Sequence, residues 1–340
     1  MFWQGYKNSH FQASSISQFT LSRTECPFFG DTVPESVKYF LYDMKDAHFY
    51  GKKLKNKGDQ ELNWIEYACE FIGTAIHVSF GLAGIFLVSQ MNIGDITKFF
   101  IIGCFFATGL LVVIYSPIGK RSGGHLNPAV TTAFWLNGLM TGLDTLWYII
   151  AQFAGAVFGA WVAFIIFPWQ TFYTTLTLPA MEYPLLISLF IEFTIIFVLI
   201  MTIFSFVSSD RSGRFTGIAA ACYVVLITVL FATISGASMN LARTFGTAAI
   251  LMRFDYLLLY FTASVLGAFA AYYLFSKATK GAKPVCSKLC HKTEGPCLFK
   301  CTCEYSHITK IQSTMPNMNN SGLKSCNDPL LTGEESLPWN

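Results

Sequence analysis

Six long apolar segments dominate the pattern of hydrophobic and polar positions along this chain. They cover residues 64–90, 99–118, 146–167, 184–207, 216–235 and 256–275. A helix needs about 20 predominantly apolar residues to cross the hydrocarbon core of a bilayer, and every segment reaches that length. The pattern therefore predicts an all-α membrane protein with six transmembrane helices.

A short phrase of small and polar residues interrupts the apolar pattern twice. It reads SGGHLNPAV at residues 122–130 and SGASMNLAR at 235–243, each time near the end of an apolar segment. Asparagine is a favoured helix N-cap and proline suits the first helical position, as at Asn127 and Pro128 in the first copy. Each copy is therefore expected to end one helix and to start another inside the membrane.

The two halves of the chain share further features in the same order. The Glu-Phe pair at 70–71 recurs at 192–193, and the Gly-Ala pair at 155–156 recurs at 267–268, where small residues let helices approach closely. Each half, 63–167 and 184–277, holds three apolar segments, so the second half enters the membrane from the opposite side. The sequence predicts an inverted repeat whose two polar phrases meet near the middle of the membrane.

Composition and charge agree with this interpretation. The 340 residues are 53% hydrophobic and 13% charged, include 33 Phe, and carry a formal net charge of +3. Lys and Arg cluster in the loops on one side of the six segments, whereas the opposite loops hold, outside the repeated phrase, only Lys98 and Arg253. The positive-inside rule then places both termini in the cytosol, and it explains the net charge without any binding to nucleic acid.

Three regions follow from these boundaries. Residues 1–62 form a polar N-terminal tail without the features of a cleaved signal peptide, residues 63–277 form the six-helix domain, and residues 278–340 form a Cys-containing C-terminal tail. Both tails are expected to be cytosolic. The sequence leaves open whether the protein lies in the plasma membrane or in an intracellular membrane.

The six segments, the inverted halves and the two Asn-Pro-Ala-type phrases resemble the aquaporin, or major intrinsic protein, family over about residues 64–277. In that family the two loops enter from opposite faces as re-entrant half-helices, and their Asn side chains meet at the pore centre. The resemblance implies a passive water channel in the lipid bilayer, assembled as a homotetramer and without a cofactor. By motif position, the pore centre comprises Asn127, Pro128, Ala129, Asn240, Leu241 and Ala242.

Leu241 departs from the family pattern, because it stands where the second phrase usually carries Pro. The leucine restores a backbone N–H at the start of a helix, where that donor lacks an intrahelical partner in any case. We expect a small geometric change, with Asn240 still capping the helix.

The resemblance also implies a selectivity filter. Its cation is Arg243, and its other positions match Thr228, Ala237 and either Phe106 or Ala107. Strict water channels of the family typically carry a His where this chain has Thr228. A threonine and an alanine leave a wider opening, so glycerol, urea, ammonia or hydrogen peroxide stand as additional small neutral permeants.

Two further features favour water and oppose ions. Thr244 directly follows the filter arginine, at a position where glycerol-conducting relatives usually carry Asp, and this favours water as one permeant. The positive dipole ends of two half-helices and the fixed cation Arg243 would repel cations and protons. An Arg within a membrane segment is itself a functional candidate.

Four other polar residues in the apolar segments and loops are interpreted as structural. Glu70 and Glu192 are expected to accept hydrogen bonds that hold the broken loops, directly or through water, and His125 to brace its own loop. His77 is isolated on an apolar segment, and the expectation is a packed histidine with satisfied hydrogen bonds.

Three other classes of function compete with a channel. An enzyme is not expected, because the segments carry only scattered ionisable residues and no spacing such as H-E-x-x-H. A proton-coupled carrier would need a titrating group on the path between Asn127 and Asn240, and none is expected there. A structural or adhesion protein with the same fold and a closed pore is the alternative that stays open.

The ten cysteines include a cluster in the C-terminal tail. Four of them are spaced as two Cys-x3-Cys pairs, which are looser than usual zinc spacings: Cys286, Cys290, Cys297 and Cys301. No metal site is predicted in the membrane domain. Zinc binding and palmitoylation are the less favoured hypotheses for the tail cysteines. The favoured hypothesis is that these cysteines have no special role.

Overall fold

The computed structural model describes residues 62–209 and 211–290. In these ranges the chain is helical, and six helices are long and apolar enough to span a membrane. They are α2 (Trp64–Ser89), α3 (Asp95–Tyr115), α6 (Gly142–Ile166), α7 (Leu185–Val207), α8 (Thr216–Ser235) and α10 (Leu257–Ala278). The predicted fold class, an all-α membrane protein with six spanning helices, is confirmed.

Shorter helices lie in the loops. They are α4 (Pro117–Ser122), α5 (Pro128–Leu136) and α9 (Leu241–Leu251), with the 3-10 helices η1 (Trp169–Thr175) and η2 (Gly213–Phe215). Helices α5 and α9 begin directly after the two asparagines of the repeated phrases. They are the half-helices that the repeat predicts.

Five of the six spanning helices differ in their bounds from the apolar segments that predict them, and one end each of α3 and α6 has a clear cause. Helix α3 ends at Tyr115 and not at 118, because Ser116 adopts an extended conformation and its side chain caps the new helix α4. Helix α6 begins at Gly142, four residues early, because Thr141 Oγ1 accepts a hydrogen bond from the backbone N–H of Asp144 at 3.1 Å. Polar capping residues thus set helix ends that hydrophobicity alone places wrongly.

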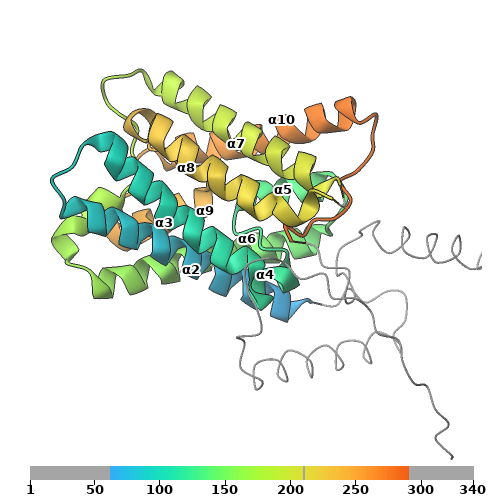
Figure 1. Cartoon of the computed structure of the whole chain (residues 1–340), viewed down its shortest axis with the longest axis horizontal. Helices are drawn as coiled ribbons and strands as arrows, with labels where there is room; N and C mark the ends of the chain where they lie inside the picture. Colours follow the sequence, from blue (N-terminus) through green and yellow to red (C-terminus); the bar gives the residue numbers. More distant parts are fainter. Residues whose placement is uncertain (1–61, 210, 291–340) are drawn as a thin grey trace, which may run out of the picture. The chain divides into compact units, whose positions relative to one another are not determined.

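The helices pack as two matching halves (Figure 1). Helix α2 packs on α3 and α6, and its counterpart α7 packs on α8 and α10. Helix α5 packs on α10, and α9 packs on α6, so each half-helix is held by the last spanning helix of the other half. This exchange brings the two repeated phrases together.

Small residues allow the spanning helices to approach closely. A Cβ on Gly155 would lie 2.2 Å from the backbone oxygen of Phe71, and one on Gly267 would lie 2.9 Å from Cγ2 of Ile196. Real Cβ atoms do not come so close to other atoms. The predicted role of the Gly-Ala pairs in helix packing is therefore confirmed for both glycines.

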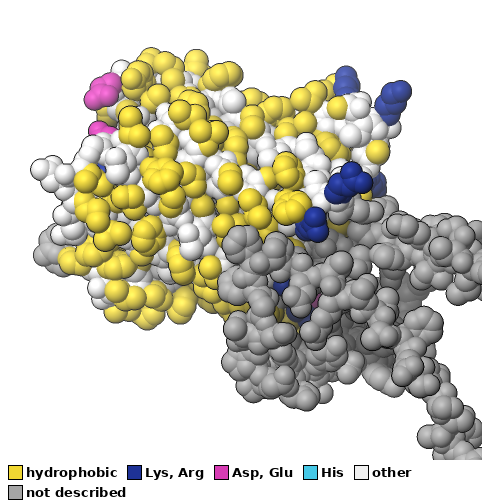
Figure 2. Space-filling view, viewed as in Figure 1, with side chains coloured by type: hydrophobic (Ala, Val, Ile, Leu, Met, Phe, Trp, Pro, Cys, Tyr) yellow, Lys and Arg dark blue, Asp and Glu magenta, His cyan; other side chains and the backbone are white. Residues whose placement is uncertain are grey.

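The outer surface of the described helices is apolar, as a lipid-facing surface requires (Figure 2). Leu186 is 72% exposed and Leu258 is 76% exposed. Lys and Arg side chains gather at the end of the molecule where α10 finishes, whereas Asp and Glu are visible at the opposite end (Figure 2).

Candidate functional site

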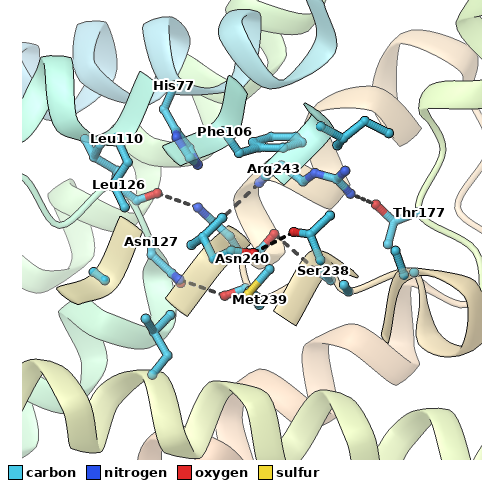
Figure 3. A pocket seen from close by; sticks show the side chains of 18 of the residues that line it. His77, Phe106, Leu110, Leu126, Asn127, Thr177, Ser238, Met239, Asn240 and Arg243 are labelled. Carbon is cyan, nitrogen blue, oxygen red and sulfur yellow. Dashed lines mark hydrogen bonds between the residues drawn. The ribbon is translucent and has the colours of Figure 1, made fainter. Parts of the chain in front are cut away.

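The two asparagines of the repeated phrases form a reciprocal pair at the junction of the half-helices. Asn127 Oδ1 accepts a hydrogen bond from the N–H of Ala129, and Asn240 Oδ1 accepts one from the N–H of Ala242, each at 3.0 Å. Their amide groups cross between the loops (Figure 3): Asn127 Nδ2 donates to the Met239 carbonyl at 2.8 Å, and Asn240 Nδ2 to the Leu126 carbonyl at 2.7 Å. Each Nδ2 keeps a second N–H for another acceptor.

The backbone just before each asparagine is strained in the same way. Leu126 and Met239 both have φ of 53°, a left-handed conformation that is uncommon for residues with a side chain. These are the two residues whose carbonyls accept from the opposite asparagine. The strain, of order 1–3 kcal/mol per residue, therefore coincides with the contact that joins the two loops.

Two buried carboxylates hold the loops in equivalent ways. Glu70 accepts from Ser122 Oγ and from the N–H groups of His125 and Leu126, at 2.7, 3.0 and 2.8 Å. Gln152 Nε2 adds a fourth bond at 2.8 Å. The loop backbone at membrane depth is thus satisfied by a side chain of the first spanning helix, as such a loop must be.

Glu192 repeats this arrangement in the second half. It accepts from Ser235 Oγ at 2.8 Å and from the N–H groups of Ser238 and Met239 at 2.9 and 3.3 Å. The donors occupy the same places in the second phrase as those of Glu70 in the first. Both carboxylates act directly, without a water between them and the loop.

A cavity of about 270 Å³ runs past the paired asparagines. Asn127 and Asn240 both line it, and Arg243 lies on the same wall (Figure 3). Pro128, Ala129, Leu241 and Ala242 are buried at the starts of α5 and α9, and they are not among the residues that line the cavity.

The structure brings most of the predicted filter positions together. Phe106, Thr228, Ala237 and Arg243 all line the cavity, whereas Ala107 does not. Of the two neighbours on α3 between which the sequence left the choice open, Phe106 is the one that lines the cavity. The Thr228 hydroxyl donates to the Val224 carbonyl at 2.7 Å, so only its lone pairs are available to a passing molecule.

Arg243 is 8% exposed and is held by neutral groups. Its Nη1 donates to Thr177 Oγ1, and its Cζ lies 4.8 Å from the centre of the Phe106 ring, a cation–π contact. Within residues 62–209 and 211–290, no carboxylate lies within salt-bridge distance of this guanidinium. The positive charge on the cavity wall is therefore not cancelled by an ion pair there.

Sequence reasoning missed Thr177, which lies in the loop after η1. Its side chain lines the cavity and contacts both Arg243 and Thr244 Oγ1, the latter at 3.4 Å. No motif marks this loop, so only the three-dimensional contact reveals its part in placing the arginine.

The expectation for His77 is wrong. His77 is 7% exposed, but it lines the cavity beside Phe106, with ring centroids 5.5 Å apart. Its Nδ1 has no hydrogen-bond partner within the described part of the chain. The imidazole points from α2 toward the interior of the cavity (Figure 3), so it is not a packed histidine with both nitrogens satisfied.

His125 braces its own loop and also contacts a distant segment. Its Nδ1 lies 3.1 Å from Thr131 Oγ1, and its Nε2 lies 2.8 Å from the carbonyl oxygen of Ser287. Because a carbonyl only accepts, Nε2 carries the proton and Nδ1 accepts from the Thr131 hydroxyl. The contact with the C-terminal segment was not predicted.

The predicted tail cluster is only partly described. Cys286 and Cys290 are buried, and Cys297 and Cys301 lie outside the described residues. Among residues 62–209 and 211–290, no group of three or more His, Cys, Asp or Glu is placed to hold a metal ion.

Comparisons with known proteins agree with this geometry. The family model "Major intrinsic protein" matches residues 59–275. Aquaporin-4 of Mus musculus is 31% identical over 256 residues, covering 68% of this chain and 75% of that protein. Glycerol uptake facilitator protein-like 6 of Lactiplantibacillus plantarum is 29% identical over 217 residues, covering 61% of this chain and 94% of that protein.

Two further matches limit what the similarity shows about this chain. Aquaporin NIP2-1 of Oryza sativa subsp. japonica is 30% identical over 184 residues, and the match spans 54% of this chain and 61% of that relative. The solved structure of the aquaglyceroporin from Plasmodium falciparum aligns with a TM-score of 0.56 at 20% identity, over 63% of this chain and 96% of that one. That likeness shows the fold. With six apolar spanning helices and a family match over residues 59–275, the chain is a multi-pass integral membrane protein that belongs to the major intrinsic protein family.

Proposed function

We propose that this protein is a passive channel that conducts water through the cavity that runs past the N-termini of α5 and α9. The observation that carries the proposal is the placement of two amide donors, Asn127 and Asn240, and of the cation Arg243 along a single cavity. Each amide has a second N–H to offer to a water oxygen, while apolar side chains such as Ile85 and Val224 line other parts of the wall. Such a wall orients water without binding it tightly, and it needs neither a cofactor nor a catalytic group.

Exclusion of ions and protons follows from the same groups. The N-termini of α5 and α9 meet at the asparagine pair, so two positive dipole ends face the centre of the path. Arg243 adds a full positive charge without a carboxylate partner in the described residues. A cation would lose hydration and meet repulsion at both places.

We propose in addition that small neutral solutes pass through the same cavity. Thr228 and Ala237 place little bulk opposite Arg243 and Phe106, which favours passage of molecules such as glycerol or urea besides water. His77 and Thr228 add hydrogen-bonding capacity that a purely apolar wall would lack.

The proposed orientation places both termini in the cytosol. At the end opposite the first phrase, Lys98 and Arg253 each pair with an aspartate, Asp95 at 3.5 Å and Asp255 at 2.7 Å. The paired Arg253 lowers the pKa of the Asp255 carboxyl, so this pair stays ionised and neutral overall at physiological pH. The uncompensated basic charge therefore lies at the other end, which the positive-inside rule assigns to the cytosol.

The assembly is proposed to be a homotetramer on the strength of family membership alone. Mass photometry in detergent at several protein concentrations tests this: a mass of four chains supports it, and a stable monomer contradicts it.

The alternative is a structural protein whose pore is closed. Stopped-flow light scattering on proteoliposomes separates the two, using an impermeant osmolyte for water and inward gradients of glycerol or urea for solutes. Replacing Thr228 with His narrows the opening and should slow solute entry more than water. Leu230→Phe, on a lipid-facing side chain that is 51% exposed, is the matched control. Solute entry that Thr228→His leaves unchanged would contradict the proposed filter.

A further inference from the structure

The segment that follows α10 folds back onto the loop of the first repeated phrase. Cys286, Ser287, Leu289 and Cys290 are each at most 2% exposed, although they lie in a tail that hydrophobicity does not place in the membrane. The segment lies beyond residues 59–275, the part that matches the family. The family match therefore does not account for it.

Two hydrogen bonds fix the segment to the loop. The N–H of Leu289 donates to the Gly123 carbonyl at 3.0 Å, and His125 Nε2 donates to the Ser287 carbonyl at 2.8 Å. Gly123 has φ of 100°, and a Cβ there would lie 3.3 Å from the Ser287 oxygen. A glycine thus permits both the turn and the close approach of the segment.

The docked segment also reaches the proposed path. The Leu289 side chain lines the same cavity as Asn127 and Arg243, and so does His125, to which the segment is bonded. An apolar side chain at this place removes space from the end of the cavity that the first-phrase loop forms.

We propose that residues 284–290 are an autoinhibitory segment, which docks over the first-phrase end of the cavity and closes it to the permeant. The proposal rests on the proposed channel function. Docking carries a cost that favours release, because the Ser287 hydroxyl is buried without a hydrogen-bond partner in the described residues. Release of the segment returns that hydroxyl to water and recovers the cost of its burial.

Full-length variants with opposite expected effects test the proposal. Leu289→Glu places a carboxylate in a buried apolar site and should release the segment. Ser287→Ala removes the unsatisfied hydroxyl but keeps the carbonyl that His125 contacts, so it should tighten docking. Lys288→Gln, within the same segment, is the control, since its side chain takes part in neither of the two bonds.

Two readouts separate docking from conduction. The first is labelling of Cys286 and Cys290 by a water-soluble maleimide under reducing conditions, followed by peptide mass spectrometry. The second is osmotic water permeability of proteoliposomes. Leu289→Glu should raise both severalfold, Ser287→Ala should lower both, and Lys288→Gln should match the wild type.

Three results would overturn the proposal. Equal labelling of wild type and Leu289→Glu would show that the segment does not dock. Increased labelling with an unchanged permeability above that of empty vesicles would show that docking does not close the path, and would leave the channel function standing. Increased labelling with every variant at the level of empty vesicles would defeat the channel function itself, and the autoinhibition with it.

Discussion

At the scale of single residues, two buried carboxylates contribute much of the free energy that holds the two loops in place. Glu70 accepts four hydrogen bonds from loop and helix donors, and Glu192 accepts three. Their presence in the first helix of each half is visible in the sequence. The identity of their partners is not, because those contacts join residues between 43 and 82 positions apart.

Removing either carboxylate should destabilise the fold. Each buried donor left without an acceptor costs about 1–3 kcal/mol, so we expect Glu70→Ala to lower the thermal midpoint more than Glu192→Ala. The midpoint is measured in detergent by size-exclusion chromatography after heating. Glu182→Ala, on an exposed loop residue, is the control and should match the wild type. A Glu70→Ala protein as stable as this control would contradict the structural role.

His77 gives the second prediction at this scale. If its imidazole exchanges hydrogen bonds with passing water, His77→Leu should lower the water permeability about 2- to 10-fold, the effect of one hydrogen bond of about 0.5–1.5 kcal/mol. His77→Asn keeps a donor and an acceptor and should retain more of the flux. Phe190→Leu, a 66% exposed lipid-facing change, controls for effects on reconstitution. Equal flux through His77→Leu and the control would show that the imidazole does not contact permeant.

At the scale of helices, the length of the apolar runs and the pairs of small residues predict the arrangement of the helices well. They predict the residues at which the helices end less well. The six spanning helices follow from runs of apolar residues, because lipid leaves few alternatives to a helix. The ends at Ser116 and Thr141 depart from the prediction, since capping by one side chain does not register in an average over 20 residues.

Helix packing predicts different effects of substitution at glycines that contact a neighbouring helix closely and at glycines with space around them. Gly155→Ala would place a methyl group 2.2 Å from the Phe71 backbone oxygen, so α2 and α6 must separate, at a cost typical of overpacking, about 1–3 kcal/mol. Gly142→Ala, where the new Cβ would lie 3.8 Å from Nε1 of Trp135, should be tolerated. Thermal midpoints in detergent compare the two proteins. A Gly155→Ala protein as stable as Gly142→Ala would show that the helices do not meet as described.

At the scale of the whole molecule, the duplication is the feature that the sequence reveals most clearly. The repeated phrases and the odd number of spans in each half predict that the two loops meet, and the crossed bonds of Asn127 and Asn240 are that meeting. Features that break the duplication could not be predicted. Thr177 and the segment around Leu289 reach the cavity from outside the two repeated halves, and His77 reaches it from a helix of the repeat at a position that no motif marks.

The central claim is that water crosses through the cavity that runs past the N-termini of the two half-helices. The most direct test is the osmotic water permeability of proteoliposomes that hold either the wild type or Ala237→Trp, which fills the cavity opposite Arg243. Both are measured in the full chain and with Leu289→Glu added, so that a docked tail is not mistaken for a missing pore. For the protein that keeps Ala237, we expect a water permeability well above that of empty vesicles. For Ala237→Trp, we expect this permeability to be lost. Equal permeability with and without Trp at position 237 would contradict the account.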